Sequence, residues 1–189
     1  MLPDLLRDDQ MRISTQRLEL VPLTSIDADD LFPVLNDPAL GRFTGEAPPA
    51  DVEVIRAGFA KWEARRSPDG AELWLNWVLR RRDDAQAVGY VQATVGDGDT
   101  AIAWTVGTAF QRQGFATEAG HALIAWLRDT LGVPLIVGSI HPDNVASQTA
   151  AQRIGLRPTD RRHEGEVVWE YVPDGYPRAM TFTPGQSVS

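Results

Sequence analysis

The sequence predicts a single α/β domain whose central sheet is mixed and mostly antiparallel, with helices flanking it. The main observation is the order of patterned segments, which is β-α-α-β-β-β-α-β-α-β-β along the chain. A second is a mostly apolar, strand-like run at 135–140, which is typical of the centre of a sheet. The third is length, because 189 residues suffice for one full hydrophobic core and are few for two.

The first predicted elements are a strand and a helix. Residues 17–23 alternate between apolar and polar side chains and predict a strand. A helix is expected to follow, capped by Thr24 or Ser25 and reaching toward Leu35. Pro33 is expected to end this helix early, because proline lacks the N–H that a helix interior needs.

A second helix and three strands come next. Residues 50–66 predict a helix with apolar side chains on one face, namely Ile55, Phe59 and Trp62. The runs 72–79 and 87–94 predict two strands. The Gly-Asp-Gly-Asp turn at 96–99 predicts a hairpin leading into a strand over 100–106.

The remaining elements alternate again. Residues 116–131 predict a helix that Gly132 ends, with a buried face formed by Ala119, Leu123, Leu127 and Leu131. After the apolar strand, residues 144–153 predict a short helix. The runs 156–162 and 166–172 predict two closing antiparallel strands.

The most informative segment is 111–119, which joins the strand over 100–106 to the following helix. A turn of small residues at this place leaves backbone N–H groups pointing outward, and the helix N-terminus adds partial positive charge, so the turn suits a diphosphate. Gly114 permits close approach of a ligand, and Ala116 adds little bulk. A tight structural turn is the alternative, and Glu118 is expected to stabilise the first helical turn.

The order Gln-x-x-Gly-x-Ala at 111–116 resembles the acetyl-CoA pyrophosphate loop of the GNAT N-acetyltransferase superfamily. The string Gly-Phe-Ala-Thr-Glu-Ala at 114–119 resembles the Rim-type branch, the ribosomal-protein-alanine N-acetyltransferases, which acetylate protein N-terminal amines. The resemblance implies splayed central strands whose gap receives the pantetheine arm of the cofactor. It also implies acetyl-CoA as co-substrate, bound by Val106, Gln111, Arg112, Gln113, Gly114, Ala116, Thr117 and Asn144.

A second motif supports the resemblance: His-Pro-Asp-Asn-Val-Ala-Ser at 141–147, followed by Arg-Ile-Gly-Leu at 153–156. In the Rim-type branch Asn-x-x-Ser opens a helix ending near Lys/Arg-x-Gly-Phe, and here Leu156 replaces the aromatic residue. The resemblance implies that Asn144 hydrogen-bonds the cofactor arm and that the Ser147 hydroxyl protonates or hydrogen-bonds the departing thiolate. Asn144 also suits a helix N-cap and Ser147 a first helical turn, so structural roles stay open.

The resemblance covers residues 17–172 and is most specific between Trp104 and Leu156. We therefore expect a GNAT domain over 13–172. The flanking segments carry none of the resemblance, and they are expected to form an N-terminal extension and a loose C-terminal tail, at 1–12 and 173–189.

The sequence does not fix the general base. Many members of the superfamily carry a Glu on the strand before the pyrophosphate loop, but residues 101–106 contain no acid. His141 is the provisional choice because it follows the next strand; the other candidates are His163, Glu164 and Glu166. Deprotonating a lysine amine at pH 7 costs roughly 4–5 kcal/mol and an α-amine only about 1 kcal/mol, so the missing carboxylate favours an α-amine acceptor.

Composition excludes several other classes of protein. The chain has no Cys, which excludes a disulfide framework and a thiol nucleophile, and its 3 His are scattered, so no metal is expected. A net charge of −8 argues against nucleic-acid binding and suits a cationic acceptor. We expect a cytoplasmic protein without membrane association, because the sequence shows no signal peptide and no apolar run that could span a bilayer.

These observations together predict an acetyl-CoA-dependent N-acetyltransferase in which the acceptor amine attacks the thioester directly. The favoured acceptor is the α-amine of a protein or peptide. Acetylation of a small-molecule amine, such as an antibiotic or polyamine, is an alternative, and a non-catalytic acyl-CoA-binding module is another. A homodimer and the use of other acyl groups are left open.

Overall fold

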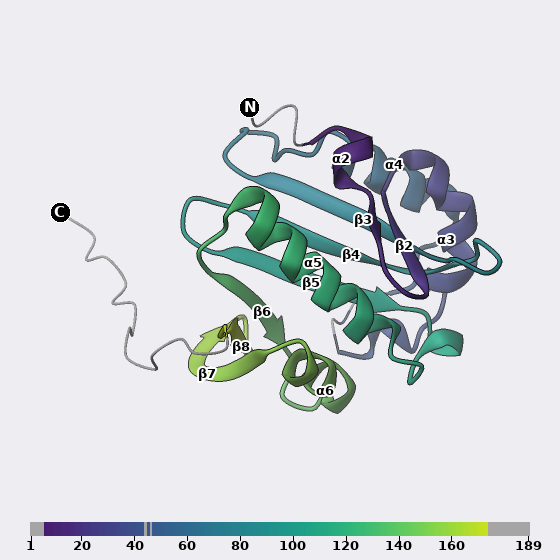
Figure 1. Ribbon diagram of the computed structural model, residues 1–189. Helices are drawn as coiled ribbons and strands as arrows, with labels where there is room; N and C mark the ends of the chain where they lie inside the picture. Colours follow the sequence, from purple (N-terminus) through teal and green to yellow (C-terminus); the bar gives the residue numbers. More distant parts are fainter. Residues whose placement is uncertain (1–5, 44, 46, 174–189) are drawn as a thin grey trace.

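An eight-stranded sheet forms the centre of the computed structural model, which describes residues 6–43, 45 and 47–173 (Figure 1). The strands are β1 (Ile13–Ser14), β2 (Leu18–Pro22), β3 (Leu73–Arg81), β4 (Ala87–Val95), β5 (Thr100–Val106), β6 (Ile136–Ile140), β7 (Leu156–His163) and β8 (Glu166–Tyr171). They lie in the order β1-β2-β3-β4-β5-β6-β8-β7, and only the β5–β6 pair within the described residues is parallel. The predicted mixed, mostly antiparallel sheet is therefore confirmed.

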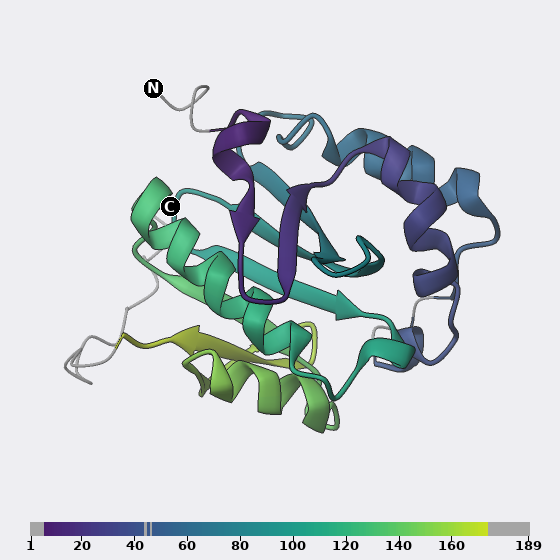
Figure 2. The ribbon, with the colours of Figure 1, turned by 45° about the vertical axis from the view of Figure 1, so that its right-hand side comes forward.

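Helices cover both faces of this sheet (Figure 2). The long helix α5 (Phe115–Leu131) lies on one face, and α3 (Ala28–Leu35) and α4 (Val52–Trp62) lie on the other. The shorter elements are α2 (Asp8–Met11), α6 (Val145–Arg153) and the 3-10 turns η1 (Ser25–Asp27), η2 (Leu40–Arg42) and η3 (Thr108–Phe110). Two hydrophobic cores result, one on each side of the sheet.

Strand β3 shows how the sequence directs side chains into both cores. Leu75, Trp77 and Leu79 are fully buried in the core beneath α5, whereas Val78 is buried in the core beneath α3 and α4. Successive side chains of a strand point to opposite faces, so a central strand covered on both sides needs apolar residues at nearly every position. Each such burial stabilises the fold by roughly 1.5–3 kcal/mol.

The central strands β5 and β6 separate after a short pairing. Their register contains two residue pairs, Thr100↔Ile136 and Ala101↔Val137, although β5 continues to Val106 and β6 to Ile140. The neighbouring strand pairs are longer. Every residue of β5 pairs with β4, and β6 pairs with β8 through Ile140. The second half of β5 therefore presents an edge to a gap, as the resemblance implied.

Two predicted helix boundaries are wrong. Helix α3 continues through Pro33 to Leu35, because a proline ring has a helical φ and removes only one hydrogen bond near the helix end. Helix α4 is shorter than the predicted 50–66. Asp51 caps it by accepting the Val54 N–H at 3.1 Å, and after Trp62 the chain turns back toward β3.

The N-terminal segment contributes to the core more than predicted. Met11, from the unpredicted helix α2, is fully buried, and its carbonyl accepts a hydrogen bond from the Trp77 indole at 2.7 Å. The Trp126 indole on α5 donates to the Gln10 carbonyl at 3.1 Å. Two buried or half-buried tryptophans thus hold the segment that precedes β1. The tail predicted over 173–189 lies outside the described residues after its first position.

Candidate active site

A cavity of about 720 Å³ opens where β5 and β6 diverge. Its walls come from five regions: the sheet strands β4 and β5, helix α4, the segment that runs from the end of α3 to the start of α4, the end of β6 with the start of α6, and the first residue of β8. The residues that matter for chemistry are Trp62, Tyr90, Thr105, His141, Asn144, Ser147 and Glu166. The cavity therefore brings residues from distant parts of the chain to the open edge of β5.

Asn144 and Ser147 reach this cavity through the start of α6. Asn144 is the N-cap of the helix, since its Oδ1 accepts the Ser147 N–H at 3.1 Å. The cap places the half-buried Ser147 side chain in the cavity wall, and among the described residues its hydroxyl has no hydrogen-bond partner. A hydroxyl near a helix N-terminus lies where negative charge is stabilised, so it can donate to an anion that forms there.

His141 also lines the cavity, but its ring is oriented by the turn that follows it. Its Nδ1 accepts the backbone N–H of Asp143 at 3.1 Å, and its ring lies 5.5 Å from that of Phe43, centroid to centroid. An imidazole that accepts at Nδ1 carries its proton at Nε2 when neutral. In this geometry the neutral His141 ring therefore presents an N–H donor at Nε2.

Glu166 is a carboxylate that lines the cavity beside His141. It begins β8, one position beyond the Ile140↔Val167 pair, and so follows the end of β6 beside His141. The side chain is half-buried, and within the described part of the chain no hydrogen bond or ion pair engages its carboxylate. The other two hairpin candidates, His163 and Glu164, are exposed and do not line the cavity.

The edge of β5 presents backbone N–H groups to the gap. The Thr100 N–H donates to the Leu135 carbonyl at 2.8 Å, across the β5–β6 junction. Because alternate residues of a strand face the same edge, the N–H groups of Trp104 and Val106 also face β6, beyond the point where pairing stops. The Val106 carbonyl is already occupied, because Gln111 Nε2 donates to it at 3.0 Å. Gln111 therefore fastens the loop to the strand.

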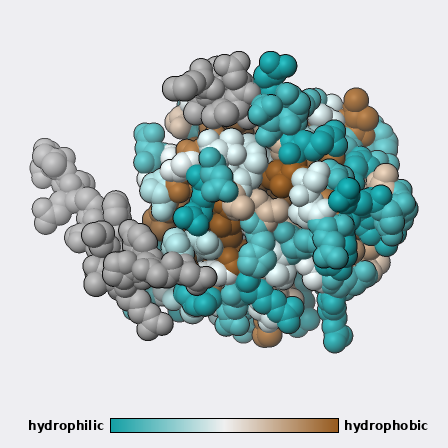
Figure 3. All heavy atoms as spheres, viewed as in Figure 1, coloured by the Kyte–Doolittle hydropathy of each residue, from teal (hydrophilic) through white to brown (hydrophobic). Residues whose placement is uncertain are grey.

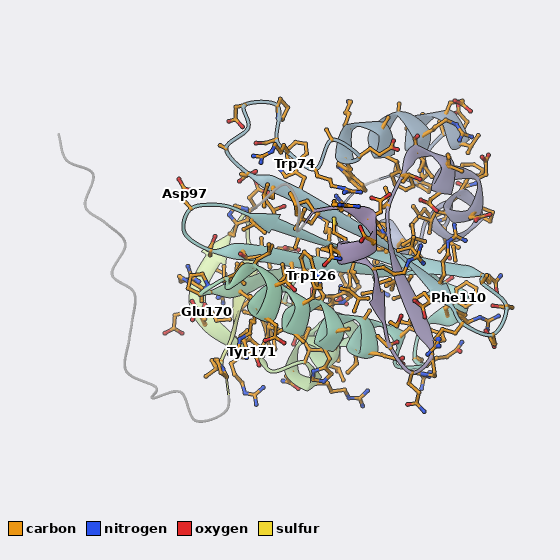
Figure 4. The ribbon with its side chains drawn as sticks, turned by 45° about the horizontal axis from the view of Figure 1, so that its top comes forward. Trp74, Asp97, Phe110, Trp126, Glu170 and Tyr171 are labelled. Atoms are coloured by element: carbon orange, nitrogen blue, oxygen red, sulfur yellow. The ribbon has the colours of Figure 1, made fainter. Side chains whose placement is uncertain are left out.

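The loop after β5 leads directly into the N-terminus of α5. Phe110, within this loop, lies at the opposite end of β5 from the turn that contains Asp97 (Figure 4). Gly114 is the N-cap of α5 at φ +85°, where an L side chain is strained, and no side chain in the described structure caps the helix in its place. The first N–H groups of α5, those of residues 115–117, are consequently left for a ligand.

Arg112 is an unusual residue of this loop. It has a left-handed backbone at φ +62°, which few non-glycine residues adopt, and its exposed guanidinium forms no ion pair within the described structure. Gln113 is also exposed, and its side chain donates to the Ala109 carbonyl at 3.2 Å. The loop thus presents one unpaired cation beside the positive end of a helix, which is an arrangement that suits an anionic group.

Glu118 lies in the first turn of α5, as expected, and its carboxylate is engaged by the β1–β2 hairpin. Its carboxylate accepts the Thr15 hydroxyl at 2.6 Å and the Arg17 backbone N–H at 2.8 Å, and it forms an ion pair with the Arg17 guanidinium at 2.7 Å. Burial alone would raise the pKa of Glu118, but the hydrogen bonds from Thr15 and Arg17 outweigh it and lower the pKa below its ordinary value. The carboxylate therefore joins α5 to the β1–β2 hairpin.

Aromatic side chains from α4 and β4 form one wall of the cavity. Trp62 from α4 contacts Phe59, at 5.5 Å between ring centroids, and Tyr90 from β4, at 5.8 Å. Trp62 lines the cavity, whereas Trp169 is 3% exposed and belongs to the core beneath α5. Trp104 is half-buried and reaches both the core and the cavity.

These features fit the parts of acetyl-CoA in turn. The α5 N-terminus with Arg112 suits the diphosphate, the free N–H edge of β5 suits the amide-bearing pantetheine arm, and the Ser147 hydroxyl suits the thiol. The remaining lining of the cavity, which includes the aromatic wall and Glu166, can face an acceptor. The arrangement can therefore bring a thioester and an amine together.

The described residues also bear on metal binding and on membrane insertion. No group of three or more His, Cys, Asp or Glu side chains in the described structure is arranged to hold a metal ion. None of the described helices combines the length and apolar character that crossing a bilayer requires. The face that carries α5 is mainly hydrophilic, with hydrophobic residues in small separate patches (Figure 3).

Solved structures of low sequence identity share this fold. A probable GNAT-family acetyltransferase from Chromobacterium violaceum is 20% identical, with a TM-score of 0.68 over 86% of each chain. A putative ribosomal-protein-serine acetyltransferase from Vibrio cholerae is 21% identical, with a TM-score of 0.67 over 86% of this chain and 97% of that one. The microcin C7 self-immunity acetyltransferase MccE, in complex with acetyl-CoA and AMP, is 17% identical, with a TM-score of 0.68 over 87% and 95%.

The family itself is shown by sequence. No curated protein matches the chain. The model of the acetyltransferase (GNAT) domain, however, matches residues 17–157, which include the strand gap, the loop before α5 and the Asn144–Ser147 motif. The chain therefore belongs to the GNAT acetyltransferase family and is an N-acetyltransferase with acetyl-CoA as its co-substrate.

Proposed function

We propose that this enzyme acetylates the α-amine of a protein or peptide, bound in the cavity opposite the Ser147 hydroxyl. The observation that carries the proposal is the continuity of the cavity from the β5–β6 gap to an unpaired carboxylate, Glu166. An acceptor ammonium group is attracted to that carboxylate, and the aromatic wall formed by Trp62 and Tyr90 suits an apolar neighbouring side chain. The net charge of −8 also favours a cationic acceptor.

The proposed reaction is direct transfer in a ternary complex. The amine nitrogen attacks the thioester carbonyl, a C–N bond forms, and the C–S bond breaks to release the thiolate of CoA. The N–H groups of Trp104 and Val106 polarise the carbonyl from the strand edge, and this stabilises the negative charge that develops on its oxygen. The Ser147 hydroxyl donates a hydrogen bond to the leaving thiolate, whose usual pKa near 8.5 makes it a fair leaving group.

The proposal assigns proton transfer to Glu166, with His141 as the alternative. Glu166 has a carboxylate without a protein partner in the cavity wall, whereas His141 presents an N–H at Nε2. An α-amine needs only about 1 kcal/mol to lose its proton at pH 7, so one carboxylate or a water chain suffices. With Glu166 as the base, His141 donates a hydrogen bond within the cavity.

The proposed acetyl-CoA site combines the β5 edge, the loop and the start of α6. The contributing residues are Val106, Gln111, Arg112, Gln113, Gly114, Ala116, Thr117 and Asn144. Gln111 contributes by anchoring the loop to Val106, since its side-chain amide is engaged there. Backbone N–H groups of Ala116 and Thr117 and the Arg112 guanidinium are the proposed partners of the diphosphate.

The Rim-type strings at 114–119 and 141–147 support assignment to the ribosomal-protein branch, and one structure of the same fold is called a putative ribosomal-protein-serine acetyltransferase. The alternative acceptor is a small-molecule amine. It is favoured by the likeness to MccE, whose structure also contains AMP. The two carboxylates that line the cavity, Asp37 and Glu166, argue against a small-molecule acceptor that carries negative charge.

A panel of acceptors tests this proposal. Acetyl-CoA is supplied with short peptides bearing free α-amines, matched N-terminally blocked peptides with a free lysine, polyamines and aminoglycosides, and thiol release is followed. We expect release with the free α-amines and little with blocked peptides. Release with only polyamines or aminoglycosides would replace the protein acceptor by a small molecule and leave acetyl transfer intact.

A further inference from the structure

We infer that Arg17 is a positioning residue that sets the direction of the Gly114 amide for binding of the CoA diphosphate. Arg17 precedes β2 and lies far from the loop in sequence, yet its guanidinium lies against the turn before α5. The inference rests on the proposed acetyl-CoA site at that turn. It adds a residue to this site from outside the motifs that define it.

The Gln113–Gly114 peptide links Arg17 to the proposed diphosphate site. Arg17 Nη1 donates a hydrogen bond to the Gln113 carbonyl at 2.9 Å. The carbonyl of Gln113 and the N–H of Gly114 belong to the same planar trans peptide, so they point in opposite directions. With the carbonyl held toward Arg17, the Gly114 N–H is directed away from the guanidinium and joins the free N–H groups at the start of α5.

The guanidinium is itself held in place, which makes it an effective clamp. Its Nε and Nη2 both donate to Glu118 Oε2 at 2.7 Å, and its carbon lies 4.8 Å from the centre of the Phe115 ring. The guanidinium is planar and rigid, and two of its nitrogens are held on the Glu118 carboxylate. The third nitrogen, Nη1, therefore has little freedom to leave the Gln113 carbonyl. A flip of the Gln113–Gly114 peptide would break a charge-assisted hydrogen bond, so the clamp opposes it.

Gly114 also fits this arrangement. A Cβ on Gly114 would lie 3.4 Å from Arg17 Nη2, and the backbone at φ +85° disfavours any other residue. Because Gly114 has no side chain, the Arg17 guanidinium can lie against the turn, on the carbonyl side of the Gln113–Gly114 peptide. Because Glu118 neutralises Arg17, the clamp acts through orientation more than through added positive charge.

The test compares two acetyl donors on purified full-length protein. Acetyl-CoA carries the diphosphate, and acetyl-pantetheine has the same thioester and pantetheine arm without it. In Arg17→Gln we expect roughly tenfold weaker acetyl-CoA binding by calorimetry, with kcat/KM for acetyl-pantetheine within about twofold of wild type. Arg17→Lys should behave like Arg17→Gln, because a lysine keeps the charge but cannot bridge both partners.

Arg82→Gln is the matched control. Arg82 supports the same hairpin by donating to the Thr15 carbonyl at 2.9 Å and pairing with Glu19 at 3.2 Å, but it does not contact the loop. Its loss should leave the affinity for acetyl-CoA unchanged. Equal losses with both donors in Arg17→Gln, or full affinity in Arg17→Lys, would overturn the inference. Failure of the acetyl-CoA site itself would appear separately, as unchanged affinity in Gly114→Glu.

Discussion

The Asn144 side chain is predicted to serve two functions that substitution can separate. It caps α6 by accepting the Ser147 N–H at 3.1 Å, and it lines the cavity at the strand gap. Asp51 provides a matched comparison, because it caps α4 by accepting the Val54 N–H at the same distance and does not line the cavity. Asn144→Ala and Asp51→Ala therefore remove equivalent caps, but only the first removes a proposed ligand of the cofactor.

The expected magnitudes follow from the two kinds of interaction. Loss of either cap should cost about 1 kcal/mol of the free energy of unfolding, which for a chain of this size lowers Tm by roughly 2–4 °C. Loss of the hydrogen bond from Asn144 to the cofactor arm should cost a further 0.5–1.5 kcal/mol, roughly, of binding free energy. That corresponds to a rise in Kd for acetyl-CoA of about two- to tenfold.

Two measurements decide the matter. Thermal unfolding without ligand should show similar losses in the two variants. Calorimetric titration with acetyl-CoA should then show weaker binding in Asn144→Ala and wild-type binding in Asp51→Ala. Equal affinities in the two variants would refute the cofactor role of Asn144 and leave it only as a helix cap.

Further variants address the chemistry and the stability of the site. Ser147→Ala should lower kcat at least about tenfold with little change in acetyl-CoA affinity, and a wild-type kcat would remove Ser147 from the mechanism. Glu166→Gln should lower kcat about 100-fold, whereas Glu164→Gln, two residues earlier in the same hairpin, should leave kcat unchanged. Glu118 has a lowered pKa, so its stabilisation is present above its ordinary value of 4.5 and disappears as pH falls through the folded value. Glu118→Gln should therefore be less stable than wild type at pH 7, with the difference in unfolding free energy shrinking below about pH 4; a difference independent of pH would contradict this.

Much of the fold could be predicted because its elements carry local signals. The alternating and apolar runs that became β2 to β8 needed only side-chain periodicity, and Gly132 ended α5 at φ +66° as expected. The boundaries of α4 were less accessible. Its end depends on Arg65, which adopts a left-handed φ of +57° before Arg66 pairs with Leu73, and this pairing is a tertiary contact that local patterns do not encode.

Some residues of the candidate site lie in local sequence motifs, whereas others are brought together only by tertiary contacts. The loop at 111–119 and the Asn144–Ser147 motif are contiguous in sequence, and their residues could be named from it. The contact between Arg17 and Glu118 joins residues 101 positions apart, and no periodicity indicates it. Glu166 could not be separated from its hairpin neighbours, because only the β6–β8 register places it beside the strand gap.

The acceptor claim is tested most directly by one competition measurement. A set of peptides, each with one free α-amine and one lysine, is incubated with the enzyme and acetyl-CoA at pH 7, and tandem mass spectrometry locates the acetyl group. We expect initial acetylation at the α-amine, and we expect Glu166→Gln to abolish or strongly slow it. Acetylation confined to the lysine side chain would contradict it.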